Sequence, residues 1–79
     1  MLTINEAFDQ GIIDYRTWNR LTIYAKNIGL KSSDHLTATS IKYFVYLAKE
    51  NHIPCAGKKT IENAEHLFEV MNNEMYEIG

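Results

Sequence analysis

The chain has 79 residues, 46% of them apolar, and a formal net charge of −2 at pH 7, which predicts one small domain spanning residues 1–79. Its longest uncharged apolar stretch is far shorter than the roughly 20 residues that cross a bilayer, and its N-terminus lacks the pattern of a signal peptide. The single cysteine, Cys55, excludes an intramolecular disulfide and fits a reducing compartment, where we expect it to be a partly buried apolar residue. We therefore expect a cytoplasmic protein with no membrane partner.

The first two predicted helices have clear start and stop signals. Thr3 and Glu6 form a capping box, and Gly11 ends the short helix that follows. Asp14 is expected to cap a second helix that runs to about Asn27, with Gly29 as its left-handed stop. The buried face of this helix is predicted to hold Trp18, Leu21, Ala25 and Ile28, and the opposite face Arg16, Asn19, Arg20, Ile23 and Asn27.

The sequence of the second half of the chain also indicates helices and contains no convincing strand pattern. Ser33 is expected to cap a single turn over 34–36, and Thr39 or Ser40 to begin a third helix through about Asn51. Pro54 prevents that helix from continuing, so residues 51–59 are predicted to form a hairpin before a last helix over 60–75, with 76–79 as a frayed tail. The apolar stripes of these two helices are Ile41, Phe44, Val45, Leu47 and Ala48, and Ile61, Ala64, Leu67, Phe68 and Met71.

The charges are segregated along the chain. All eight lysines and arginines lie between residues 16 and 59, where only two of the ten acids, Asp34 and Glu50, are found, so this segment has a net charge of +6. The remaining acids lie before and after it. A basic middle within an acidic total is consistent with a polyanion site, although part of the pattern is the ordinary preference of charges for helix ends.

The junction at residues 53–64 is the strongest candidate for such a site. Gly57 can take a backbone conformation closed to other residues, Thr60 is a good N-cap, and the first-turn amides that follow have no intrahelical acceptor. Lys58 and Lys59 add full positive charges beside those amides. The plain alternative is a helix cap with two solvated lysines.

Two motifs resemble the C-terminal domain of the bacterial RNA polymerase alpha subunit. Two helices flanking a short turn form a candidate helix-hairpin-helix, and its run Gly57-Lys58-Lys59-Thr60-Ile61-Glu62 is similar to the hairpin of that family. Cys55 stands where the general helix-hairpin-helix pattern has another glycine. The second motif is Arg16-Thr17-Trp18-Asn19-Arg20-Leu21, which is similar to the helix start that accompanies the hairpin in the same family.

The resemblance implies an all-α fold and a DNA site. The fold is a compact, SAM-domain-like bundle of four to five short helices, and the partner is the minor groove of A·T-rich double-stranded DNA together with its phosphate backbone. By position, the DNA-binding residues are Arg16, Asn19, Arg20, Gly57, Lys58, Lys59 and Thr60. This agrees with the physics of a narrow A·T-rich groove, whose negative potential attracts arginine.

The chain also departs from the family. The two motifs are further apart than usual, and the additional residues lengthen the third helix around 41–51. A longer helix can move the hairpin away from Arg16 or add a partner surface through Lys42, Tyr43 and Tyr46. The large assembly domain of a polymerase subunit is missing, so the chain looks like a free-standing bacterial or phage relative.

Each site residue has a structural alternative. Arg16 and Arg20 can pair with Asp14, Glu62 or Glu65, each such surface pair contributing under roughly 1 kcal/mol. Trp18 is expected in the core, because it shares the face of Leu21 and Ala25.

Catalysis and metal binding find no support in the sequence. His52 and Cys55 lack a second pair of zinc ligands, and no nucleophile has a recognisable base beside it. We therefore expect that the chain is not an enzyme and that it binds no cofactor, metal or small-molecule substrate.

Two functions remain open. The first is a DNA-binding transcription accessory that uses the seven residues named above. The second is a protein-interaction module that keeps the fold and docks on RNA polymerase or a transcription regulator, through its acidic last helix or the surface of Tyr43 and Tyr46.

Overall fold

The computed structural model describes residues 2–53 and 56–78, without the side chains of 74–78. It contains the four helices α1 (Ile4–Asp9), α2 (Tyr15–Asn27), α3 (Ala38–Lys49) and α4 (Lys58–Ile78). Within the described residues there is no strand, and the only β-type pairing is an isolated bridge between Thr3 and His35. The predicted compact all-α fold is confirmed, with a radius of gyration of 11.5 Å.

The caps of α1 and α2 form as predicted. The Thr3 hydroxyl accepts from the Glu6 N–H at 3.0 Å while the Glu6 carboxylate accepts from the Thr3 N–H at 2.9 Å. The Asp14 carboxylate accepts from the Thr17 N–H at 2.8 Å at the start of α2. Gly11 and Gly29 end the two helices with φ of 76° and 84°, a conformation that glycine adopts at little cost.

The segment between α2 and α3 differs from the prediction. Residues 34–36 form no helical turn, because the Asp34 carboxylate instead accepts from the Lys31 N–H at 2.8 Å and closes a turn that leads into the bridge at His35. α3 begins earlier than expected, with Thr37 as the N-cap whose hydroxyl accepts from the Ser40 N–H at 3.1 Å. Its C-terminus is followed by Asn51 at φ 62°, a left-handed residue that asparagine tolerates.

The last helix starts before the residue predicted to cap it. α4 begins at Lys58, so Thr60 lies inside the first turn and is only 1% exposed, and its assignment as N-cap is wrong. The Ile61 N–H donates to the Gly57 carbonyl at 3.1 Å, which is the first backbone bond of this helix. α4 also continues to Ile78, beyond the predicted end. Pro54 and Cys55, with the burial expected for Cys55, lie outside the described residues.

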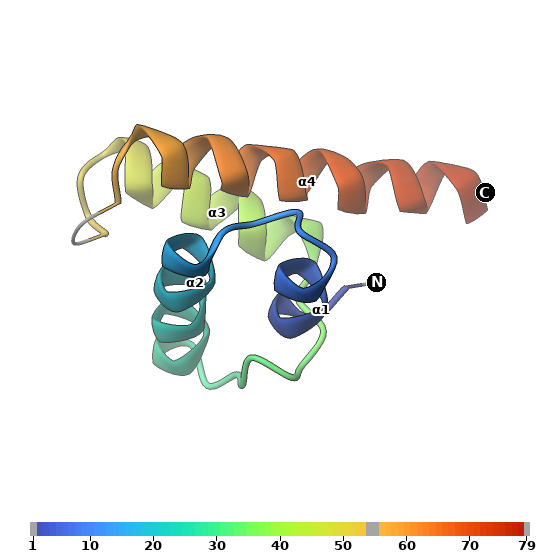
Figure 1. The fold of residues 1–79 in the computed structure, drawn as a ribbon, viewed down its shortest axis with the longest axis horizontal. Helices are drawn as coiled ribbons and strands as arrows, with labels where there is room; N and C mark the ends of the chain where they lie inside the picture. The colour runs from blue at the N-terminus through green and yellow to red at the C-terminus, as the bar shows by residue number, and fades with distance from the viewer. Residues whose placement is uncertain (1, 54–55, 79) are drawn as a thin grey trace.

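The helices form two layers (Figure 1). α3 and α4 lie antiparallel along each other, and α1 and α2 pack beneath them, with the C-terminal part of α4 extending past the body. Phe44 is fully buried, and Tyr24 packs against it edge-on at 5.5 Å between ring centroids. The predicted apolar stripes of α3 and α4 point inward or are half-buried.

The buried face of α2 is rotated relative to the prediction. Ile28 is 46% exposed and so does not belong to the core, whereas Thr17 and Tyr24 are buried on this helix. Trp18 packs against the core as expected but is only partly buried, and its indole N–H donates to the Asn5 side chain at 2.8 Å. The N-terminus of α2 lies next to α4 (Figure 1).

Candidate nucleic-acid interface

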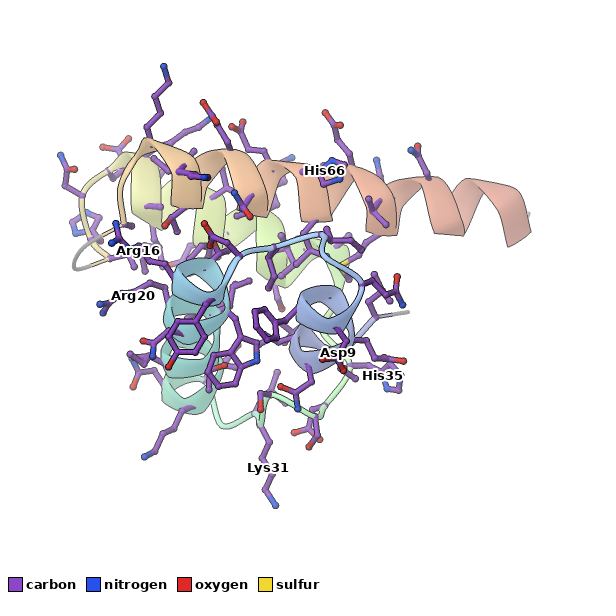
Figure 2. The ribbon with its side chains drawn as sticks, viewed as in Figure 1. Asp9, Arg16, Arg20, Lys31, His35 and His66 are labelled. Carbon is purple, nitrogen blue, oxygen red and sulfur yellow. The ribbon has the colours of Figure 1, made fainter. Side chains whose placement is uncertain are left out.

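The starts of α2 and α4 meet at one surface hollow. Its volume is about 470 Å³. Asp14, Tyr15 and Arg16 line it at the start of α2, and Gly57, Lys59 and Thr60 line it at the start of α4. Figure 2 shows Arg16 at the end of α2 that lies beneath α4. The two sequence motifs are therefore neighbours in the fold, and the α3 of 12 residues does not separate them.

A side chain from the second turn of α4 holds these helix starts together. The Asn63 amide oxygen accepts from the Asp14 N–H at 2.8 Å, and the Asn63 amide nitrogen donates to the Lys59 carbonyl at 2.8 Å. Asn63 thus ties the N-cap of α2 to the first turn of α4. Bonds made at both ends of one side chain restrict the relative positions of Arg16 and Lys59.

The hollow is electropositive for two reasons. The N-terminus of a helix carries roughly half a positive charge and first-turn N–H groups without intrahelical acceptors, and two such ends converge here. The side chains of Arg16 and Lys59 add full charges and make no ion pair with any side chain in the described part of the chain. This arrangement suits an anion such as a phosphate group.

Asp14 opposes this charge in part. Hydrogen bonds from Thr17 lower the pKa of the Asp14 carboxyl, and the nearby charges of Lys59 and Arg16 lower that pKa further. The carboxylate is therefore ionised at neutral pH. It is occupied as the cap of α2, and it offsets one of the two cations that line the hollow with it.

Four of the seven predicted site residues come together and three do not. Arg16, Gly57, Lys59 and Thr60 line the hollow, whereas Lys58, Asn19 and Arg20 do not. Arg20 lies on the same side of α2 as Arg16 (Figure 2). Its side chain lines a separate hollow of about 310 Å³ with the neighbouring Ile23, and its Nε is buried without a hydrogen-bond partner in the described structure.

The role predicted for Gly57 needs correction. Its φ is outside the left-handed region, and a Cβ added there would meet no atom of the described residues within 4 Å. Neither the backbone conformation nor a contact with the described residues therefore requires glycine here. What remains is its position on the wall of the hollow, where the missing side chain leaves the backbone open to a ligand.

Sequence reasoning missed Asp14 and Tyr15 as members of the site. Asp14 was predicted as the cap of α2 and as a possible ion-pair partner of Arg16, but not as a residue of the DNA site. The ion pairs proposed as the alternative for Arg16 and Arg20 do not form within the described residues, and Glu65 pairs instead with Lys49 at 3.1 Å.

Comparisons with models of known protein families, with curated proteins and with solved structures found no match to this chain. Among the residues that the structure describes, no helix is both long enough and apolar enough to cross a membrane. The same residues hold no group of three or more His, Cys, Asp or Glu side chains placed to bind a metal ion.

Proposed function

We propose that this chain is a small, non-enzymatic DNA-binding module of the cytoplasm, a bacterial or phage transcription accessory similar to the C-terminal domain of the RNA polymerase alpha subunit. The observation that carries the proposal is the shared hollow of Arg16, Gly57, Lys59 and Thr60. In this function Arg16 enters the minor groove of A·T-rich duplex DNA, and the amides at the start of α4 bind a flanking phosphate together with Lys59.

Binding to an A·T-rich duplex, measured by fluorescence anisotropy at several salt concentrations, tests this function. Affinity is expected to fall with salt, because each neutralised phosphate releases counterions. Arg16→Gln and Lys59→Gln should each weaken binding, and the Lys59 change should reduce the salt slope by about one. Lys31→Gln is the matched control, since this exposed lysine lies at the far end of α2 from the hollow (Figure 2). Equal affinities for all four proteins would reject the proposal.

A protein-interaction module is the second candidate, and the hollow beside Arg20 favours it. Three of its lining residues, Ile23, Ile28 and Tyr43, are large apolar side chains about half exposed. An apolar surface of this kind can dock on a component of the transcription machinery, such as RNA polymerase or a regulator. A pull-down with the native chain tests whether it captures purified polymerase. Capture that is lost in Ile23→Ser but kept in Lys59→Gln would favour this function over DNA binding.

A further inference from the structure

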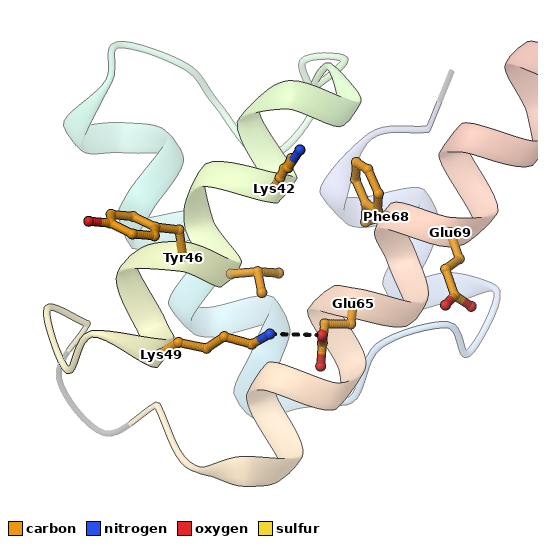
Figure 3. A pocket seen from close by; sticks show the side chains of 7 residues that line it. Lys42, Tyr46, Lys49, Glu65, Phe68 and Glu69 are labelled. Carbon is orange, nitrogen blue, oxygen red and sulfur yellow. Dashed lines mark hydrogen bonds and ion pairs between the residues drawn. The ribbon is translucent and has the colours of Figure 1, made fainter.

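A second surface feature lies between α3 and α4, away from the Arg16 hollow. It is a groove of about 390 Å³ with an apolar floor made by Val45 and Phe68, and Tyr46 lines its α3 edge. Tyr46 is 56% exposed. Figure 3 shows its phenol on the α3 side, and Phe68 projecting from α4 toward the groove. The groove therefore exposes apolar surface along a helical hairpin.

The charges of the groove are sorted by helix. Lys42 and Lys49 lie on the α3 side, and Glu65 and Glu69 lie on the α4 side (Figure 3). One pair spans the groove, Lys49 to Glu65 at 3.1 Å, with side chains 55% and 47% exposed. Lys42 and Glu69 make no ion pair with any other side chain in the described part of the chain. One edge of the groove is thus basic and the other acidic.

This pattern is complementary to itself under one symmetry operation. A two-fold axis parallel to the groove places α3 of one copy over α4 of the other, so that the basic edge of each copy faces the acidic edge of its partner. The result is a bundle of four helices in which all neighbouring helices are antiparallel. A two-fold axis across the groove would instead oppose lysine to lysine.

We propose that the α3–α4 groove is a homodimer interface whose occupant is the same groove of a second copy. Val45 and Phe68 of both copies form its apolar centre, with Tyr46 at the α3 edge, and Lys42 pairs with the partner's Glu69 at two symmetric positions. Lys49 and Glu65, already paired within each copy, lie beside the partner's Glu65 and Lys49 and extend the charge network. Because the apolar floor is small and the ion pairs are exposed, the dimer is weak and forms at high protein concentration. This interface does not depend on DNA binding.

Charge exchange tests the pairing of Lys42 with the partner's Glu69. Lys42→Glu leaves two acids at these positions and Glu69→Lys leaves two bases, so each variant alone places like charges together twice per dimer. Each change should raise the dimer dissociation constant about tenfold or more. An equimolar mixture of the two variants should dimerise again, because both cross-pairs are then opposite in charge, and the double variant Lys42→Glu/Glu69→Lys should dimerise alone.

Sedimentation velocity over a wide range of protein concentration gives the readout. Lys31→Glu is the control, since it makes the same charge change outside the groove and should leave the dimer intact. Tyr46→Ser, which removes apolar surface at the α3 edge that α4 of the partner covers, should weaken the dimer without altering charge. A native chain that stays monomeric at every concentration, or charge variants whose mixture stays monomeric, would overturn the proposal.

Discussion

The backbone N–H of Asp14 donates to the side-chain oxygen of Asn63 at 2.8 Å, across 49 residues of sequence. This bond joins the start of α2 to the second turn of α4, and the other end of Asn63 fixes the Lys59 carbonyl. The two cations of the hollow, Arg16 and Lys59, therefore lie on helix starts that are held in register by one asparagine.

Replacement of Asn63 should loosen the site and the fold together. Asn63→Ala leaves the Asp14 N–H without its acceptor and is expected to lower the free energy of unfolding by about 1 kcal/mol. Urea denaturation measures this loss. Asn27→Ala, a change at an exposed asparagine of the same domain, should stay within about 0.5 kcal/mol of the native chain. Equal stabilities of the two variants would show that the Asn63 bonds contribute nothing.

Removal of the acid from the hollow should strengthen DNA binding. Asp14→Asn deletes the one negative charge among the residues that line the hollow, while asparagine remains a good N-cap for α2. We expect tighter binding to the A·T-rich duplex in anisotropy titrations, with the largest gain at low salt. Asp34→Asn, which removes an acid that does not line the hollow, serves as the control. A weaker complex for Asp14→Asn would contradict the assigned site.

Stability should fall as the solution becomes acidic. The pKa values of the Asp14 and Glu6 carboxyls are lowered in the fold, from ordinary values of 3.8 and 4.5, chiefly by backbone hydrogen bonds from Thr17 and Thr3. The unfolded chain therefore takes up protons more readily, so the stabilisation is complete above the ordinary pKa values and is lost as pH falls through the lowered ones. Thermal melts between neutral pH and pH about 3 measure this loss.

Asp14→Asn should flatten that pH profile, because the substituted side chain does not titrate. Asp9→Asn is the comparison, since Asp9 is exposed and caps no helix. A profile that steepens for Asp14→Asn would show that the carboxylate is not stabilised by its capping bonds.

Gly57→Ala should separate folding from binding. The added methyl group meets no atom of the described residues and the backbone is not left-handed there, so the midpoint of thermal unfolding should fall only by the modest cost of alanine at a helix N-cap. DNA affinity should fall, because the methyl group projects from a wall of the hollow that a phosphate must approach. Gly29→Ala should instead affect stability and leave binding unchanged. Because Gly29 has a φ of 84°, alanine there should lower the free energy of unfolding by roughly 1 kcal/mol, while the folded fraction binds DNA as the native chain does. Unaltered DNA affinity for Gly57→Ala would remove Gly57 from the site.

The helix starts near Thr3 and Asp14 were predictable because their caps depend on residues three positions apart. The starts of α3 and α4 were misplaced because several residues near each start can cap a helix. Thr37 caps α3, although Thr39 and Ser40 are also good caps, and Thr60 is buried inside a helix that begins at Lys58. The burial of Tyr24 was missed because a tyrosine can pack its ring while its hydroxyl donates to a carbonyl, here that of Ser40 at 3.3 Å.

The site was predictable only as far as local motifs reach. Both halves follow from short runs of sequence, the helix start around Arg16 and the turn at Gly57. Their meeting was implied only by the family resemblance. The Asn63 hydrogen bond that ties them together links positions 49 residues apart and has no local signature. Arg20 was included by its position in the motif, yet it lies one turn further along α2 than Arg16, where its side chain lines a different hollow.

Backbone amide NMR shifts during titration with an A·T-rich duplex test most directly whether the two helix starts form one DNA site. We expect the largest shifts to fall together on Tyr15, Arg16, Gly57 and Lys59, and to shrink across the whole set in Arg16→Gln. Shifts confined to one helix start, shifts centred on Arg20 and Tyr43, or no shifts at low salt would contradict this expectation.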